Sequence, residues 1–267
     1  MTKQISMKLI NKIKTGITVV AMATAAASCT KTFDEKVTQQ RDFSGSSLLQ
    51  LYNGTVGATR NYIYVNSKPL NGAAIAFGGV FPGTGYGFAV PIGQQSFLIR
   101  DTLTATTQAQ MSFAQNLQSA RNYTIFMYDT TTAAKQKTVE TSIVIPDDTT
   151  ARIRFANFIY NPGVTPAVDI YSQKRQQTIF TNVAVTDVTA YIPYASGVTD
   201  TFYVRPTGTG TNLQNLVPTP APGTWTDIRA ILTPTEKRSY TLVFRGGFRA
   251  TTSTNATVRT LSVFPNN

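Results

Sequence analysis

The stretch "RIRFAN" (152–157) decides the fold, because it lies in a run, "ARIRFANF" (151–158), whose alternating side chains are typical of a β-strand. A second version of it, "LLQLYN" (48–53), occurs roughly 105 residues earlier. Further pairs follow in the same order, at an offset that grows by 12 residues between 205 and 240. The body of the chain therefore consists of two similar repeats. The other pairs are "YIYVNS" (62–67) with "AVDIYS" (167–172), "FAVP" (88–91) with "AYIP" (190–193), "FLIR" (97–100) with "FYVR" (202–205), "NYTIFMY" (122–128) with "SYTLVFR" (239–245), and "SIVIP" (142–146) with "LSVFP" (261–265).

The composition indicates an all-β fold. Only 14% of the residues are charged, and Thr, Val, Tyr and Phe are abundant. Segment 107–120 fits a two-residue repeat about as well as a helical one, and we predict a strand there. The sequence predicts two tandem β-sandwiches, 46–147 and 148–267, which meet at the polar stretch "PDDTT" (146–150). The second has a longer loop at 207–225, whose prolines exclude it from a central strand.

Residues 1–28 have the pattern of a signal peptide. A start with four lysines and no acid precedes a short apolar stretch, 17–27, which is too brief to span a bilayer. Small residues then lead into Cys29, the only cysteine of the chain. The triplet before Cys29 resembles the lipobox of bacterial lipoproteins, which implies a lipid on the Cys29 sulfur and a mature chain that starts there. The alternative is cleavage elsewhere, which leaves a free thiol.

The segment after Cys29 predicts a tether and a location. Residues 29–45 are polar with balanced charge, as expected of a flexible tether. The pair Asp34-Glu35 resembles the surface-export signal of Bacteroidota lipoproteins. We therefore predict a protein anchored by lipid to the outer membrane, and leave both its periplasmic and its cell-surface face open. Its expected partners are the membrane and a glycan or an envelope protein, and not nucleic acid.

The second half resembles a known family. "ARIRFANFIYNPGVTPAVDIY" (151–171), "TIFTNVAVTDVTAYIPYASGVTDTFYVRPTGT" (178–209) and "YTLVFRGG" (240–247) are similar to the bacterial domain-of-unknown-function family 4397. Members of that family often occur as tandem modules in exported proteins and lipoproteins. The resemblance implies β-sandwiches of immunoglobulin or transthyretin type, and it implies no activity.

Missing residue types exclude several kinds of catalysis. The chain has no histidine, so Ser-His-Asp and Cys-His catalysis and His/Cys zinc sites lack their parts. A glycosidase needs two facing carboxylates, but the adjacent pairs, Asp34-Glu35 and Asp147-Asp148, lie in the tether and the hinge. Asp147-Asp148 is interpreted as solvated acids in preference to a calcium site. We predict a protein that is not an enzyme and needs no cofactor or metal.

Five residues are candidates for ligand binding, each with a structural alternative. Phe81 and Tyr86 lie in "GGVFPGTGYG" (78–87), a loop that lacks the context of a phosphate cradle, and they either fill the core or form a stacking platform. For Trp225 we favour the role of a core anchor, and stacking on a ligand is the second interpretation. Arg152 and Arg154 share a strand face. With Arg245, Arg249 and Arg259 this face either attracts a polyanion or is an ordinary solvated surface.

Three functions remain open from the sequence. The favoured one is a membrane-anchored envelope lipoprotein with a non-enzymatic binding or structural role. The alternative is a carbohydrate-binding lipoprotein that accompanies glycan uptake, which requires exposed aromatic residues gathered on one surface. The third, a glycan hydrolase, requires two carboxylates that face each other in a cleft.

Overall fold

The computed structural model describes residues 44–143, 145–217, 224–249 and 257–267, and every regular element in this part is a β-strand. These residues belong to one compact unit, Phe43–Asn267. The expected signal peptide, Cys29 and the tether up to residue 43 lie outside the described residues. Within the described part, no helix has the length and apolar character needed to cross a bilayer.

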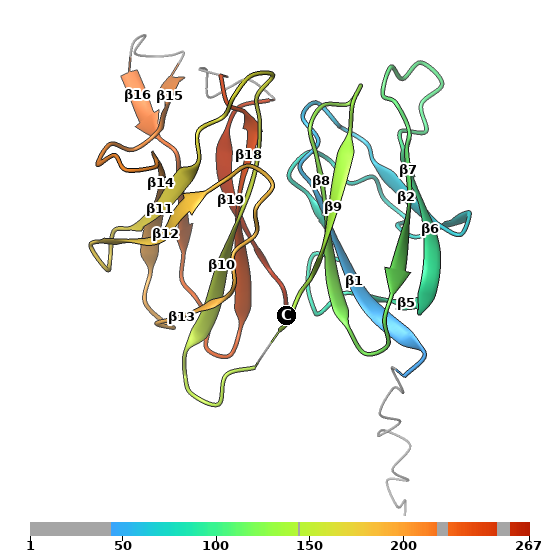
Figure 1. The fold of residues 1–267 in the computed structure, drawn as a ribbon, viewed down its shortest axis with the longest axis horizontal. Helices are drawn as coiled ribbons and strands as arrows, with labels where there is room; N and C mark the ends of the chain where they lie inside the picture. Colours follow the sequence, from blue (N-terminus) through green and yellow to red (C-terminus); the bar gives the residue numbers. More distant parts are fainter. Residues whose placement is uncertain (1–43, 144, 218–223, 250–256) are drawn as a thin grey trace, which may run out of the picture. The chain divides into compact units, whose positions relative to one another are not determined.

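The first β-sandwich consists of two sheets (Figure 1). Sheet 1A has the strand order β4-β1-β8-β9, with β5 also paired to β1, and sheet 1B has the order β3-β2-β6-β7. The bounds are β1 (Ser46–Asn53), β2 (Tyr62–Val65), β3 (Lys68–Pro69), β4 (Val80–Phe81), β5 (Phe88–Pro91), β6 (Gly93–Arg100), β7 (Met111–Leu117), β8 (Asn122–Tyr128) and β9 (Lys135–Glu140).

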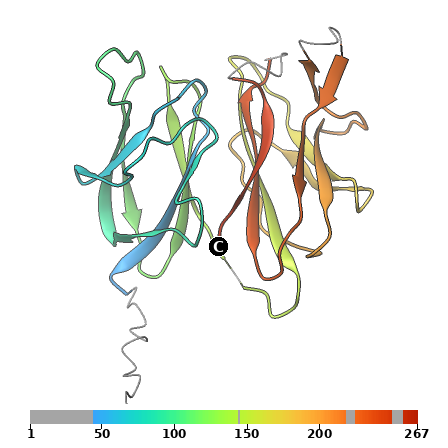
Figure 2. The same cartoon turned by 180° about the vertical axis from the view of Figure 1, so that it is seen from behind.

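The second β-sandwich repeats this plan (Figure 2). Sheet 2A has the order β13-β10-β18-β19, sheet 2B has the order β12-β11-β14-β17, and β15 and β16 form a separate hairpin. The bounds are β10 (Ala151–Tyr160), β11 (Val168–Ser172), β12 (Gln177–Val183), β13 (Ile192–Tyr194), β14 (Asp200–Pro206), β15 (Gln214–Val217), β16 (Thr224–Asp227), β17 (Arg229–Leu232), β18 (Ser239–Gly247) and β19 (Thr260–Pro265).

The predicted repeat matches the strand pairing, with one exception. In each sandwich the first strand pairs in parallel with a late one, β1 with β8 and β10 with β18. The last strand then pairs antiparallel with that partner, β9 with β8 and β19 with β18. The match of "SIVIP" with "LSVFP" is wrong, because β9 ends at Glu140 and the described residues of 142–146 form no strand. An apolar run that ends in proline has the composition of a strand even when it only links two sandwiches. The prediction of a strand within 107–120 is confirmed by β7.

Each sandwich has its own core, and a third apolar cluster joins sheet 1A to sheet 2A. The ring centroids of Phe126 and Phe158 lie 4.6 Å apart, and those of Tyr52 and Phe264 lie 5.3 Å apart. The hydroxyl groups of Tyr52 and Ser262 are 2.7 Å apart. Burying four aromatic side chains stabilises this contact by several kcal/mol, at roughly 1.5–3 kcal/mol each.

The contact between sheets 1A and 2A explains which strands are buried on both faces. In β1, β8, β10 and β18 successive side chains are buried, because sheets 1A and 2A are covered on both faces. In β6 buried residues alternate with more exposed ones, and in β7 partly buried residues alternate with exposed ones, because sheet 1B is covered on one face. The expectation that "ARIRFANF" has one solvated face is therefore wrong, since its polar face meets the other sandwich.

A buried carboxylate ties three strands of the second sandwich together. Asp200 accepts hydrogen bonds from the hydroxyls of Ser172 (2.5 Å) and Tyr194, and from the backbone N–H groups of Lys174 (2.7 Å) and Thr201 (2.6 Å). Burial alone would raise the pKa of Asp200, but these hydrogen bonds outweigh it and hold the pKa below its ordinary value. Burial and the contact with Asp200 raise the pKa of Tyr194 to about 12.

We expect Asp200→Asn to lower the free energy of unfolding at pH 7 by about 2 kcal/mol, because four donors lose a charged acceptor. Because the pKa of Asp200 is lowered by folding, its contribution is full above the unfolded pKa of about 4 and is lost as the pH falls through the folded pKa. Urea unfolding at pH 7, 5 and 3 measures the difference, which should shrink only at the lowest pH. Glu236→Gln, at an exposed turn, is the control. A difference that does not depend on pH contradicts the assignment.

Candidate functional site

The structure separates the three aromatic candidates. Phe81 packs against the core of the first sandwich, with its ring centroid 5.4 Å from that of Phe88, so the core interpretation holds for it. Tyr86 is 40% exposed and Trp225 is 50% exposed, so neither is a core anchor. Tyr86 lies in a loop of the first sandwich and Trp225 in the β15–β16 hairpin of the second. No ring contact joins them in the described part of the chain, so the expected aromatic platform does not form from these residues.

The two arginine candidates are engaged inside the protein. Arg154 is 2% exposed and lies in the contact between sheets 1A and 2A. Its Nε donates to Thr241 (2.9 Å), and its Nη2 donates to Thr124 and Thr141 (3.2 Å each). Burial lowers the pKa of the Arg154 guanidinium below its ordinary value. Arg152 is half-buried and donates to groups within 150–151 of its own chain. Burial removes Arg154 from any surface that a polyanion reaches.

Arg245 and Arg259, two other arginines of the expected basic face, make contacts within the chain. The guanidinium carbon of Arg245 lies 4.1 Å from the ring centroid of Phe77. Arg259 donates to Asn215 and to the carbonyl oxygen of Phe248. Four of the five arginines of the expected face therefore have contacts within the chain, and Arg249 is exposed.

A hollow of about 530 Å³, which we call the outer hollow, opens on the solvated face of sheet 1B. Alternation along the strands places Tyr64, Leu98 and Arg100 on this face, while Phe97 and Ile99 are buried in the core. The register puts Tyr64 opposite Leu98, and Leu98 opposite Ser112. Small side chains on β6 and β7 thus form a floor beside larger ones. The lining residues are Tyr64, Ser67, Ser96, Phe97, Leu98, Arg100, Ser112, Phe113 and Ala114.

Arg100 is the charged group of the outer hollow. Its guanidinium carbon lies 5.0 Å from the ring centroid of Tyr64, within the range of a cation–π contact. The three ion pairs among the described residues all involve other side chains. No hydrogen bond within the described part engages the Arg100 guanidinium or the hydroxyls of Tyr64, Ser67 and Ser112. The hollow therefore offers a held cation, an aromatic ring and several hydroxyls to a ligand.

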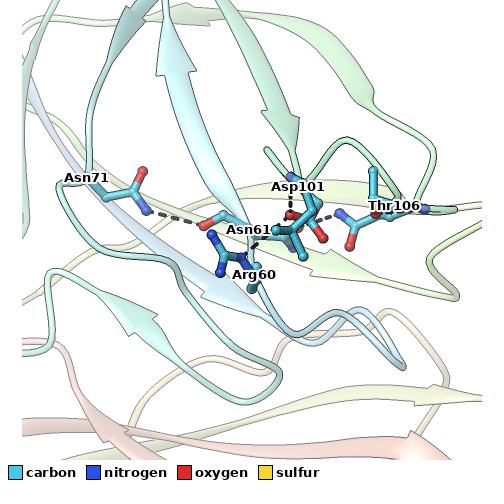
Figure 3. Close-up of polar contacts among 7 residues, drawn as sticks. Arg60, Asn61, Asn71, Asp101 and Thr106 are labelled. Atoms are coloured by element: carbon cyan, nitrogen blue, oxygen red, sulfur yellow. Dashed lines mark hydrogen bonds and ion pairs between the residues drawn. The ribbon is translucent and has the colours of Figure 1, made fainter.

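A polar network beside the outer hollow explains why Arg100 has no carboxylate partner (Figure 3). Asp101, the next residue, faces Arg60, with Oδ1 3.7 Å from the Arg60 Nε. Asn71 donates to the carbonyl oxygen of Asn61 (3.2 Å), and Gln108 donates to the Asn61 side chain (2.5 Å). Asp101, the acid next to Arg100 in the sequence, therefore pairs with Arg60 and does not line the hollow.

The second sandwich contains the same tyrosine–arginine pair in a different state. The guanidinium carbon of Arg205 lies 3.5 Å from the ring centroid of Tyr171, and the two residues have the same cross-strand offset as Tyr64 and Arg100. Here, however, the Nε of Arg205 donates to Asn212 (2.8 Å), and the Tyr171 hydroxyl donates to Gln176 (3.4 Å). The second pair is thus engaged within the chain, and the first is not.

A smaller cleft of about 310 Å³ lies where the sandwiches meet. Its charged groups already form an ion pair, with the Lys135 Nζ 2.7 Å from the Asp129 carboxylate. Tyr128, Tyr160 and Asn161 complete much of its wall. A ligand there competes with this ion pair, so the outer hollow is the better candidate.

Sequence reasoning missed Tyr64 and Arg100 as site residues. A signal was present, because the arginine that ends "FLIR" returns at the end of "FYVR". Arg205 is engaged because it donates a hydrogen bond to Asn212, which lies in the longer loop of the second sandwich.

No family model matches the chain, and no curated protein does. The resemblance to the domain-of-unknown-function family 4397 therefore stays a prediction. Among solved structures, one match is the family 26 carbohydrate-binding module CBMbc of Eubacterium rectale Amy13K, crystallised in complex with maltoheptaose. It has 12% sequence identity and a TM-score of 0.25, and covers 81% of this chain and 96% of that chain. At that TM-score, the function of this chain has to be argued from its own residues.

We expect Arg154→Met to keep or raise the stability, because a buried charge without a carboxylate partner is replaced by an apolar side chain of similar length. The Thr124 and Thr141 hydroxyls stay bonded to each other at 2.7 Å. Arg154→Ala should cost about 2–5 kcal/mol, since it leaves a cavity. Urea unfolding measures both variants. A loss of stability in Arg154→Met as large as in Arg154→Ala contradicts this account.

Proposed function

We propose that the chain is a non-enzymatic lipoprotein of the cell envelope that binds a carboxylated glycan in the outer hollow. The observation that carries the proposal is the Arg100 guanidinium, which is held against Tyr64 beside free hydroxyls and has no carboxylate partner among the described residues. An arginine fork matches a carboxylate in shape and charge. An aromatic ring packs on the apolar face of a sugar, and hydroxyl groups exchange hydrogen bonds with its polar edge.

The use of the acids supports a non-enzymatic role. Asp169, Asp200 and Asp227 accept hydrogen bonds from groups of neighbouring strands. Asp129 and Glu140 form ion pairs with a lysine and an arginine. Hydrolysis of a glycan needs two carboxylates that are free to face a substrate. The outer hollow itself is lined by no acid.

The anchor completes the proposal. A lipid on Cys29 would hold the protein to the outer membrane, and two or more acyl chains hold far more firmly than one. Residues 29–45 then serve as the tether that leads to β1. Removing the four lysines of residues 1–28 leaves a formal net charge of +7, which favours anionic ligands on either side of that membrane.

A second candidate function, that of a structural spacer in an envelope assembly, is favoured by the contact between sheets 1A and 2A. Its stacked rings and the hydrogen bond from the Lys137 Nζ to the carbonyl oxygen of Thr186 (2.6 Å) restrain the two sandwiches. A spacer needs that rigidity, but it does not need the free groups of the outer hollow.

We expect the chain from residue 30 onward, which contains the whole compact unit, to bind glycans that carry carboxylates on an array, more weakly as salt rises. Calorimetry with a short oligosaccharide should show roughly tenfold weaker binding for Tyr64→Ala, which loses the ring, about 1.4 kcal/mol. Arg100→Ala should weaken binding at low salt by a similar factor and reduce the salt dependence.

Arg229→Ala is the matched control, because it removes one positive charge from an exposed position of sheet 2B. Its affinity should equal that of the unchanged chain. Absence of any glycan ligand, or an equal loss in Arg100→Ala and Arg229→Ala, contradicts the proposal and leaves the spacer.

The anchor is tested separately with Cys29→Ser in cells fed a labelled fatty acid. The unchanged protein should carry the label and remain with the membranes, and the variant should carry none, because the serine hydroxyl does not replace the thiol in lipid transfer. Labelling of Cys29→Ser contradicts lipid attachment at this residue. Protease added to intact cells then distinguishes the surface from the periplasm.

A further inference from the structure

The edge strands of the sheets differ in how they are protected against pairing with another chain. A free edge offers unpaired backbone N–H and C=O groups, and proteins usually block it with charge, proline, a bulge or short length. In the described part, β9 carries charges, β12 has an irregular register, and β3, β5, β13 and β19 contain proline. β4 and β17 are short.

Strand β7 has none of these devices. It pairs with β6 in seven consecutive positions without a shift, and it contains neither a charged residue nor proline. The neutral run extends over 102–120, between Asp101 and Arg121. No backbone hydrogen bond of Met111–Leu117 to any strand but β6 occurs among the described residues. This is a regular, seven-residue edge that is left open.

We propose that β7 pairs antiparallel with β7 of a second copy of this chain. Charge favours a second copy over a charged partner, because a neutral strand gains nothing from opposite charge. Two copies of this basic chain repel each other less at a neutral strand than at a charged surface. A two-fold axis at Ala114 sets Ser112 opposite Asn116 of the other copy, and Met111 opposite Leu117 of the other copy. These two pairs are compatible in polarity, Phe113 lies opposite Gln115 of the other copy, and small side chains meet at the axis.

The pairing places the two outer hollows on the same face of one continuous sheet. Ser112, Phe113 and Ala114 of β7 line each hollow, so the hollows approach each other across the new strand pair. A glycan polymer then meets two sites at once, which raises its apparent affinity without any new contact. This consequence rests on the proposed function, whereas the strand pairing does not.

The pairing is tested in intact cells with Ala114→Cys in the full chain. Opposite residues of an antiparallel pair have Cα atoms about 4.5–5.5 Å apart, within the range of a disulfide. A disulfide-linked dimer should appear on a non-reducing gel. Gln94→Cys, on the same face of β6 and one strand further from the edge, is the matched control and should give none. Absence of the Ala114→Cys dimer, or equal dimer in both variants, overturns the proposal.

Sedimentation velocity of the chain from residue 30 onward gives a second test, with circular dichroism to confirm folding. The unchanged chain and Gln94→Lys should sediment as dimers, and Ala114→Lys as a monomer, because two lysines would meet at the axis. A monomeric unchanged chain, or a dimer that survives Ala114→Lys, overturns the pairing. If no glycan binds any variant while the dimer persists, only the proposed function fails.

Discussion

The parallel pairing of an early strand with a late one is the constraint on which both sandwiches depend. β10 and β18 pair over nine positions although more than 80 residues separate them along the chain, and β1 and β8 pair over six positions in the first sandwich. All other strands of each sandwich except the last one, β9 or β19, lie between these two along the chain. Such long-range closure costs chain entropy before it gains contacts. It is offset by side chains such as Ile153, Phe155 and Leu242, which are completely buried.

These central pairs also explain how the two sandwiches contact each other. One face of sheets 1A and 2A fills a core, and the other carries Tyr52, Phe126, Phe158 and Phe264, which would be costly to leave in water. Covering both faces makes the central strands nearly continuous in burial. It also brings Arg154 into the contact, where hydroxyl oxygens that accept its hydrogen bonds and the faces of aromatic rings take the place of water. The sequence pattern of Arg154 is that of a surface residue, but its charge lies in the interior.

The sequence predicts the β composition, the duplication and the positions of most strands, because these follow from local alternation and from comparing one half with the other. The fate of Arg154 does not follow from it. An alternating strand looks the same whether its polar face meets water or another sheet, and the covering residues Thr124 and Phe126 lie in the other half of the chain. Trp225 has the opposite outcome, since its hairpin contributes to neither sandwich sheet. Patterns fix the elements, and contacts between distant elements decide exposure.

The outer hollow owes its existence to side-chain size along one cross-strand row. In the first sandwich the row consists of Tyr64, Leu98 and Ser112. Side-chain size therefore decreases toward β7, and space remains beside Arg100. The corresponding row of the second sandwich reads Tyr171, Tyr203 and Arg229, in which every side chain is large. An exposed arginine on a tyrosine ring is by itself ordinary surface chemistry, as Arg205 shows. Arg100 differs because side-chain size decreases along the row beside it. Its guanidinium has no carboxylate partner and lies next to small side chains, which leaves room for a ligand that carries a carboxylate.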